Sequence, residues 1–387
     1  MTTDGPDPAV TTSAPGRVMA TDSPDPAAVI EAFGLPGPVT GWEPVGGAWS
    51  NRVYRLDAGG RCYAVKEMRN PWAEPRWQEW LAEAWSFEQR AIAAGVTAPR
   101  PVPNPADGAC LARVSRLSQS SHESQSSHES QSSHDSHTGR GNHTSQAGLG
   151  APVRVHHWTV GVPVRPGPVD AATARWAGRV LAILHGLRIM PQDRSLFPVT
   201  GTATADRWPE LTEAARRRKA PWTSAMEEAA PGVALIADLA RSAGFRPDQE
   251  VMTHGDIDQK NLLLATSGPV LCDWDLAAPL VPRRELADVA MSLAAWADTA
   301  IAREVVRSYR RAGGDDTRIE PADLGQSMMI GLDWVAFNVE RAIGLRPAGK
   351  AEAGLARGLV PGLLAAIPVQ VAAAARVRDL DAPAGPG

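Results

Sequence analysis

Three polar side chains in the second half of the chain have the types and spacing that phosphoryl transfer requires. Asp256 and Asn261 lie five residues apart, and Asp273 follows after a short apolar run. Transfer of a phosphoryl group from a nucleotide needs a base that orients the attacking hydroxyl and oxygen ligands for magnesium. We therefore predict Asp256 as the catalytic base and Asn261 and Asp273 as ligands of a Mg²⁺ ion, which prefers hard oxygen donors.

Polar neighbours of these three residues have less certain roles. His254 is expected to brace the loop, because a neutral imidazole can tie backbone to carboxylate. Asp275 is expected to support the metal ligands without touching the metal, or alternatively to be an additional ligand. Asp258 could lie near the departing phosphate or cap a turn. Each acid taken singly is more often a cap or a solvated charge, so the prediction depends on the combined pattern.

A lysine in the front part of the chain could bind the nucleotide. Lys66 ends an apolar stretch of strand character and precedes a predicted helix that carries Glu83 and Glu88. In phosphoryl transfer by kinases, such a lysine reaches the α- and β-phosphates and is held by a glutamate of the next helix. Glu88 lies beside the apolar stripe of the helix, so we favour it over Glu83.

A glycine pair provides a further candidate for phosphate contact. Gly46 and Gly47 lie between two apolar segments and precede Ser50. Glycines allow backbone amides to approach phosphate oxygens, and the Ser50 hydroxyl could add a contact. The segment lacks the pattern of a P-loop, and a ligand-free hairpin turn would look the same.

Hydrophobic patterning predicts strands at the front and helices at the back. Alternating apolar residues over 39–56 and 60–68 indicate strands, and 110–114 with 153–158 indicate a hairpin. Helices are expected at about 76–94, from an N-cap at Asp170, and around 283–312, 321–344 and 351–377. This order indicates an α+β fold with two lobes.

Two segments have compositions that oppose folding. Residues 1–27 carry Pro, Asp, Thr and Ser and are expected to be a disordered tail. Residues 118–150 contain a six-residue Ser/His repeat with five of the nine histidines. We expect a solvated insertion at the tip of the predicted hairpin. The alternative, metal binding, is disfavoured because a six-residue period matches neither a helical face nor a tetrahedral site.

The overall composition excludes several classes of protein. A net charge of -4 gives no sign of the basic surface with which proteins bind nucleic acid. Three scattered cysteines (Cys62, Cys110, Cys272) form neither a disulfide framework nor a zinc cluster, which fits a reducing cytoplasm. The longest apolar run, 359–375, contains two prolines and is short for a membrane span. We therefore expect a cytoplasmic protein without membrane or nucleic-acid partners, either a monomer or a homodimer.

The chain resembles the aminoglycoside phosphotransferase and choline kinase-like superfamily of small-molecule kinases. The resemblance rests on His254-Gly255-Asp256 with Asn261, on Asp273-Trp274-Asp275, and on similarity over about residues 40–345. Gly255 is typical of small-molecule members, because protein kinases usually carry arginine there. The resemblance implies a bilobal protein-kinase-like fold, with a β-rich N-lobe (28–160) containing one helix and a mainly helical C-lobe (161–380).

The resemblance also implies further roles for individual residues. Backbone groups around His157 and Trp158 would meet adenine in the hinge, and His185 would be structural. Asp288 would brace the catalytic loop. Residues 257–260 (Ile-Asp-Gln-Lys) depart from the family's common Leu-His-Pro-Gly, so the substrate side of this loop is unusual.

These expectations favour an O-phosphotransferase that uses ATP, or alternatively GTP, with Mg²⁺ and a small-molecule hydroxyl acceptor. The acceptor could be an aminoglycoside-like antibiotic, an amino alcohol or a sugar. Mixed charges after Arg283 argue against a strongly cationic one. A nucleotide-binding pseudokinase or scaffold of the same fold is the main alternative. A kinase of protein side chains is a distant third, because Gly255 and the short segment between Asp275 and Glu285 oppose it.

Overall fold

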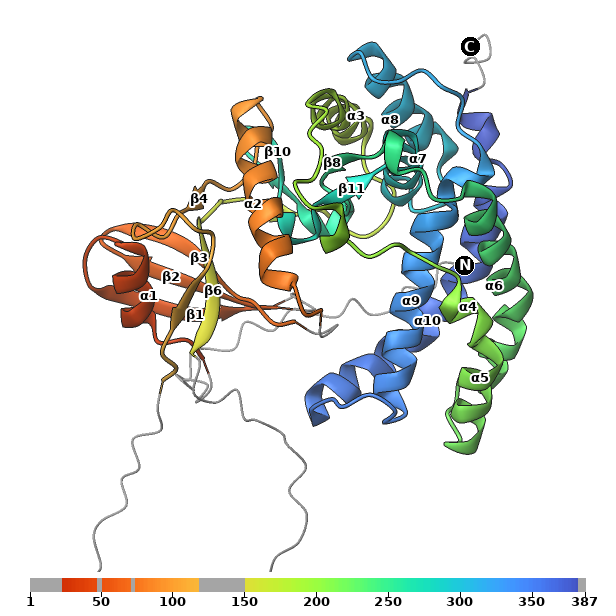
Figure 1. Cartoon of the computed structure of the whole chain (residues 1–387), viewed down its shortest axis with the longest axis horizontal. Coiled ribbons are helices and arrows are strands. Elements are labelled where there is room, and N and C mark those ends of the chain that lie inside the picture. Colours follow the sequence, from red (N-terminus) through yellow and green to blue (C-terminus); the bar gives the residue numbers. More distant parts are fainter. Residues whose placement is uncertain (1–22, 47–50, 71–73, 118–149, 382–387) are drawn as a thin grey trace, which may run out of the picture. The chain divides into compact units, whose positions relative to one another are not determined.

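The structure is a computed structural model that describes residues 23–46, 51–70, 74–117 and 150–381. The chain divides into two compact units, residues 1–71 with 102–157, and residues 72–101 with 158–387. Helix α2 (Trp77–Ala93) thus clusters with the second unit, although we expected it in the N-terminal lobe. The predicted α+β class is confirmed (Figure 1).

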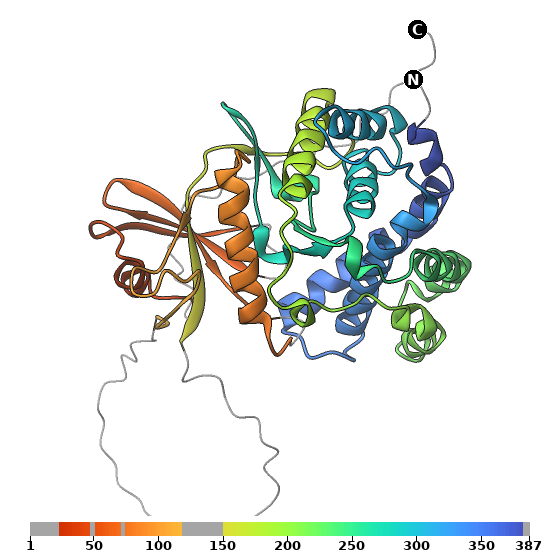
Figure 2. The same ribbon diagram turned by 45° about the horizontal axis from the view of Figure 1, so that its top comes forward.

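An antiparallel sheet forms most of the first unit and appears as one curved surface in Figure 2. Its strands follow the order β1-β2-β3-β6-β4, and β5 pairs with β6. Alternate residues of β2 and β3 are buried, as a sheet with one covered face requires. The elements are α1 (Pro26–Phe33), β1 (Val39–Val45), β2 (Arg52–Ala58), β3 (Arg61–Glu67), β4 (Pro101–Val102), β5 (Ala112–Val114) and β6 (Ala151–His157).

The structure confirms the predicted hairpin of β5 and β6, in which Ala112 lies opposite Val153. The Ser/His repeat of the insertion, residues 118–149, lies outside the described residues. The predicted disorder of residues 23–27 is wrong, because α1 begins at Pro26 with Asp25 as its N-cap. Residues 1–22 lie outside the described part of the chain.

Helices around three short strand pairings form the second unit. The structure confirms Asp170 as an N-cap, since its carboxylate accepts from Ala172 and Thr173. Gly178 lets α3 approach α8 closely, because an added Cβ would meet the Val305 carbonyl at 2.4 Å. The helices are α3 (Ala171–Gly186), α4 (Ala203–Asp206), α5 (Trp208–Arg217), α6 (Thr223–Ala243), α7 (Pro282–Leu293), α8 (Thr299–Arg311), α9 (Gly325–Ala342) and α10 (Lys350–Ala374), and the strands are β7 (Val162–Pro163), β8 (Val251–Thr253), β9 (Leu262–Ala265), β10 (Gly268–Leu271) and β11 (Ala278–Leu280).

The single helix predicted around 283–312 is wrong, because it is two helices. Ala295 and Trp296 have positive φ angles of 49° and 58° between α7 and α8, and Asp298 caps α8. The left-handed backbone at two consecutive non-glycine residues ends the first helix. The amphipathic helices α5 and α6 were not predicted.

Helix α10 packs against α6 and α9 (Figure 1). Its length and hydropathy would suffice to cross a membrane, although the sequence prediction judged the apolar run too short. Two prolines lie inside it, and 22% of its most apolar window is buried. Length and composition alone are weak evidence for a membrane span.

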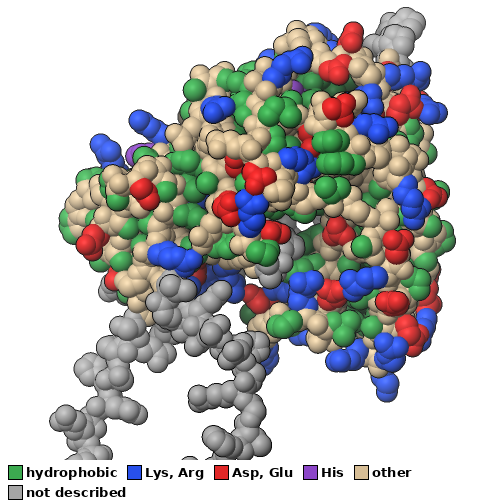
Figure 3. Space-filling model, in the orientation of Figure 1, with side chains coloured by type: hydrophobic (Ala, Val, Ile, Leu, Met, Phe, Trp, Pro, Cys, Tyr) green, Lys and Arg blue, Asp and Glu red, His purple; other side chains and the backbone are tan. Residues whose placement is uncertain are grey.

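On the face shown in Figure 3, basic and acidic side chains are interspersed.

Candidate active site

The loop after β8 is held in a conformation that requires glycine. β8 pairs with β11, so Thr253 lies opposite Ala278. Gly255 follows with φ 77°, and a Cβ there would lie 2.8 Å from the Leu276 carbonyl oxygen. Both the left-handed backbone and the close approach exclude larger residues. The glycine that marks the predicted motif thus has a local structural cause.

His254 connects the two halves of the motif. Its Nε2 lies 3.0 Å from the Cys272 carbonyl oxygen, and the Asp256 amide donates to its Nδ1 at 3.2 Å. Since Nδ1 accepts, Nε2 carries the proton and the ring is neutral. Burial lowers the pKa of His254, which favours this neutral form. The side chain therefore has the geometry of the bracing role predicted for it.

Asp256 is held by two side chains of its own loop. Lys260 Nζ donates to its Oδ1 at 2.9 Å, and Asn261 Nδ2 donates to its Oδ2 at 2.9 Å. Burial raises the pKa of Asp256, whereas Lys260 opposes this rise. An ionised carboxylate has about four acceptor positions, so an approaching hydroxyl can still donate to it.

A short hairpin brings Asn261 and Asp273 together. β9 and β10 pair with Leu262 opposite Leu271, and the Cys272 amide donates to the Asn261 carbonyl at 2.8 Å. Asp273 has an exposed side chain and a left-handed backbone, with φ 64°. Such strain in a non-glycine residue is typical of functional sites. The two predicted metal ligands thus flank the same end of one hairpin.

These residues fit a magnesium ion. Both supply oxygen donors, and the Asn261 amide nitrogen is already engaged by Asp256, which leaves its oxygen for a ligand. Within the described ranges, no cluster of three or more His, Cys, Asp or Glu could hold a metal. Mg²⁺ needs no such cluster, because it is usually bound by one or two protein oxygens together with waters and nucleotide phosphates.

Glu285 on α7 holds the loop that carries Asp256. Its Oε1 accepts from the Gly255 amide at 2.8 Å, and its Oε2 accepts from the Thr253 hydroxyl. Burial acts to raise its pKa, but hydrogen bonds from His185, Thr253 and Gly255 outweigh burial and lower it. The resemblance implied this role for Asp288, one helical turn further along α7, whereas Glu285 makes the contacts with Gly255 and Thr253.

His185 connects this brace to α8, which fits the structural role predicted for it. Its Nε2 lies 2.6 Å from Glu285 Oε2, and its Nδ1 lies 2.9 Å from the Tyr309 hydroxyl. All three side chains are buried. The predicted catalytic loop is therefore tied through Glu285, His185 and Tyr309 to three helices, α7, α3 and α8.

Asp288 is an acid whose ionised form is disfavoured in the folded state. Burial raises its pKa to about 7, with further contributions from Asp256 and Asp258. Its folded pKa exceeds the usual 3.8, so its stabilising effect is complete below pH 3.8 and is lost as pH rises through 7. We expect Asp288→Asn to be more stable than the parent at pH 8 by about 1–3 kcal/mol, with little difference near pH 4. Urea denaturation at several pH values measures this.

Asp315→Asn is a control for which the change in stability should depend on pH in the opposite direction. Hydrogen bonds from Thr317 lower the pKa of Asp315, so its ionised form stabilises the fold above its usual pKa, and that stability is lost as pH falls. A uniform destabilisation by Asp288→Asn at every pH would contradict the assignment.

The predicted nucleotide-side residues lie in both units. Lys66 is in β3, opposite Val53 of β2 and Arg154 of β6. His157 ends β6, with its ring 5.3 Å from that of Tyr63, and the chain enters the second unit at Trp158. Ser50 lies outside the described residues. The roles of these residues remain predictions.

The two glutamates of α2 differ in environment. Glu88 is completely buried. Glu83 accepts a hydrogen bond from the Gln192 amide at 3.2 Å. Next to Glu88, Phe87 contacts Trp274, whose ring also packs 4.8 Å from His254. Trp274 thus connects the segment of the predicted metal ligand Asp273 to α2 through Phe87.

Sequence reasoning missed two further residues of the loop. Lys260 pairs with Asp256 and lies 3.6 Å from Asp258. Gln259 is buried and donates to the carbonyls of Gly167 and Ser292, which fixes the loop between two segments. The unusual sequence of residues 257–260 was the available signal.

Comparison with known proteins identifies the family. The model of the phosphotransferase enzyme family matches residues 41–321, most of the chain. The chain belongs to the phosphotransferase enzyme family. The predicted resemblance is thereby confirmed, and the protein is a small-molecule phosphotransferase. No curated protein sequence matches it significantly.

Solved structures of small-molecule kinases share the fold of this phosphotransferase. Spectinomycin phosphotransferase with ADP and spectinomycin has a TM-score of 0.62 at 10% identity, covering 91% of this chain and 98% of that one. An aminoglycoside phosphotransferase from Alicyclobacillus acidocaldarius has a TM-score of 0.54 at 14% identity, and the match covers 93% of this chain and 98% of that one. Amicoumacin kinase with AMP-PNP has a TM-score of 0.54 at 11% identity, and the match covers 88% of this chain and 92% of that one. At these identities the likeness shows the fold alone.

Proposed function

We propose that the protein transfers the γ-phosphate of ATP, or of GTP, to a hydroxyl group of a small molecule. The observation that carries this proposal is the joint placement of Asp256, Asn261 and Asp273 by one loop and one hairpin. The family relationship and the relatives bound to ADP or AMP-PNP support nucleotide use. An aminoglycoside-like antibiotic, an amino alcohol or a sugar is the proposed acceptor.

In this proposal Asp256 orients the acceptor hydroxyl and takes its proton. Its raised pKa favours the transfer, because a base is most effective when its pKa approaches the working pH. Lys260 fixes one carboxylate oxygen and Asn261 the other, which preserves the orientation of the group. A magnesium ion held by Asn261 and Asp273 would neutralise charge on the phosphates.

The proposed nucleotide contacts involve both side chains and backbone groups. Lys66 binds the α- and β-phosphates and Glu88 orients it, whereas the hydrogen bond of Glu83 to Gln192 leaves Glu83 the weaker candidate. Ser50 contacts phosphate, and backbone groups at His157 and Trp158 contact adenine. All three cysteines are free, which supports a cytoplasmic location. One chain carries every proposed group, so either a monomer or a homodimer would be competent.

Release of ADP from ATP, and of GDP from GTP, tests the proposal across amino alcohols, sugars and aminoglycosides. We expect release that depends on the acceptor hydroxyl and stops when EDTA removes Mg²⁺. The deoxy analogue of each active acceptor is the matched control. Nucleotide binding without turnover over the whole panel would instead favour the pseudokinase.

A further inference from the structure

Lys260 is a cation among the acids of the candidate site. The segments 253–261 and 272–276 together contain four aspartates and one lysine. Lys260 Nζ lies 2.9 Å from Asp256 Oδ1 and 3.6 Å from Asp258 Oδ2. Its charge also interacts with that of Asp273. The ammonium group is therefore within electrostatic reach of both the proposed base and a proposed ligand of Mg²⁺.

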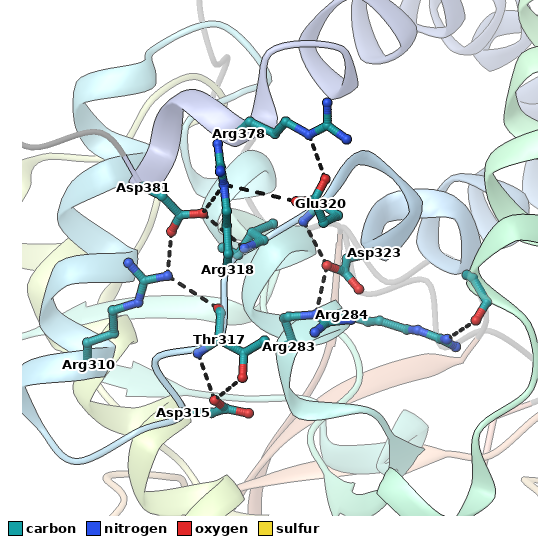
Figure 4. A network of polar contacts seen from close by, with 12 residues as sticks. Arg283, Arg284, Arg310, Asp315, Thr317, Arg318, Glu320, Asp323, Arg378 and Asp381 are labelled. Atoms are coloured by element: carbon teal, nitrogen blue, oxygen red, sulfur yellow. Dashed lines mark hydrogen bonds and ion pairs between the residues drawn. The ribbon is translucent and has the colours of Figure 1, made fainter.

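A role in holding the fold together does not account for this position. Elsewhere in the second unit, ion pairs connect segments that are distant in the sequence, as Arg283 of α7 does with Asp323 at 2.8 Å (Figure 4). Lys260 and Asp256 are four residues apart, so their pair lies within a single loop. That loop is already held by Glu285. An ion pair with a half-exposed lysine contributes little to stability.

The ammonium group of Lys260 has N–H donors left for a ligand. An ammonium group has several donors, and Asp256 accepts from one of them. The distance of 3.6 Å to Asp258 is longer than a hydrogen bond. The Lys260 side chain is 50% exposed and has a long flexible stem. It can therefore direct a second N–H toward a group that approaches Asp256.

Phosphoryl transfer would bring negative charge to this place. In the proposed reaction the acceptor oxygen bonds to the γ-phosphorus and its proton passes to Asp256. The bond from that phosphorus to the oxygen bridging the β- and γ-phosphates breaks, and ADP leaves with the electron pair. Because the acceptor oxygen must lie within hydrogen-bond reach of Asp256, the phosphorus it attacks is the next atom beyond it. Lys260 Nζ is itself one hydrogen bond from Asp256, so it can reach the oxygens of that phosphoryl group.

We propose that Lys260 binds the γ-phosphoryl group of the nucleotide, through an N–H that Asp256 does not use, and stabilises the charge on its oxygens during transfer. Lys260 is then a further catalytic residue, which holds the base and the phosphoryl group next to each other. This inference rests on the proposed function, because it assumes a nucleoside triphosphate as the donor. The contact itself can be measured without turnover.

Calorimetric titration with two nucleotides tests this contact. AMP-PNP carries a γ-phosphoryl group that is not readily transferred, whereas ADP lacks that group, and each is titrated into the full chain with Mg²⁺. We expect the affinity for AMP-PNP to fall by about tenfold or more in Lys260→Met, because a charge-assisted hydrogen bond is lost. The affinity for ADP should stay as in the parent.

Matched variants separate charge from other effects of the substitution. Lys260→Arg keeps the charge and should retain most of the affinity for AMP-PNP. Lys350 is exposed at the start of α10, so Lys350→Met is the charge-matched control and should bind both nucleotides as the parent does. Urea denaturation checks that each variant keeps a cooperative unfolding transition. If Lys260→Met does not fold, Lys260→Gln replaces it, because glutamine can still donate to Asp256 but carries no charge.

Three results would overturn the contact with the γ-phosphoryl group. The first is an unchanged ratio of the affinities for AMP-PNP and ADP in the uncharged variants. The second is an equal loss of both affinities, which would indicate a structural role for Lys260. The third is a parent protein that binds neither nucleotide, which would overturn the proposed function as well.

Steady-state ADP release distinguishes this inference from the proposed function. With an active acceptor, Lys260→Met should lower kcat by about tenfold or more and leave the KM of the acceptor unchanged. Turnover by the parent together with an unchanged affinity ratio in Lys260→Met would overturn the inference and leave the proposed function standing. Selective loss of AMP-PNP affinity, with no turnover of any acceptor by the parent, would refute the proposed function and leave the γ-phosphoryl contact supported.

Discussion

Replacement of Asp256 by asparagine is expected to lower kcat by about 10²–10⁴-fold, the usual contribution of a general base. Asparagine keeps the size of the side chain, and its amide oxygen can still accept from Lys260 or Asn261. It cannot take a proton from the acceptor. The loss should therefore appear in kcat, with the affinity for nucleotide retained. Steady-state ADP release and calorimetric titration with ADP measure the two quantities.

Asp298→Asn is the matched control for this experiment. Asp298 caps α8 through the amides of Ala300 and Ile301, and asparagine caps helices equally well. This variant should retain full activity. If Asp256→Asn is also fully active, Asp256 is not the base. If it loses its cooperative unfolding transition, the retained fold that this test assumes is wrong.

Replacement of Glu285 by alanine is expected to destabilise the fold by about 3–5 kcal/mol. The change removes the acceptor of the Gly255 amide and the Thr253 hydroxyl and leaves His185 without its carboxylate. Each buried donor that loses its partner costs about 1–3 kcal/mol. Such a loss is a large fraction of the stability of an ordinary domain. Urea denaturation measures it, and activity should fall because the catalytic loop loses its support.

Two further variants separate this effect from a general loss of charge. Glu285→Gln keeps an acceptor for Gly255, and His185 can change tautomer and donate to Tyr309, so its cost should be smaller. Glu213 is exposed and pairs with Arg216 and Arg217, so Glu213→Ala should cost at most about 1 kcal/mol. A Glu285→Ala variant as stable as Glu213→Ala would show that the brace does not support the fold.

The sequence was sufficient where a local pattern determines the structure. Alternation of apolar residues predicted the strands that carry Lys66, and the cap at Asp170 predicted the start of α3. The spacing of Asp256, Asn261 and Asp273 predicted residues that the hairpin brings together. Each of these predictions depends only on residues that lie close together in the sequence.

Contacts between distant segments could not be predicted in the same way. Glu285 and Asp288 are both acids near the start of one helix, and only the packing of α7 against β8 shows which one reaches Gly255. The break between α7 and α8 depends on positive φ angles at alanine and tryptophan, which favour no such conformation.

The β9–β10 hairpin sets the distance between the proposed metal ligands Asn261 and Asp273 independently of the chain length between them. Asn261 and Asp273 flank its paired end, whereas Thr266 and Ser267 form the turn at the opposite end. Residues added at that turn would lengthen the chain between the two proposed ligands and leave their distance in space unchanged. In a simple loop, the number of residues between Asn261 and Asp273 would determine the distance between them. Because the hairpin fixes this distance, the sequence and length of the turn can change without moving the two side chains.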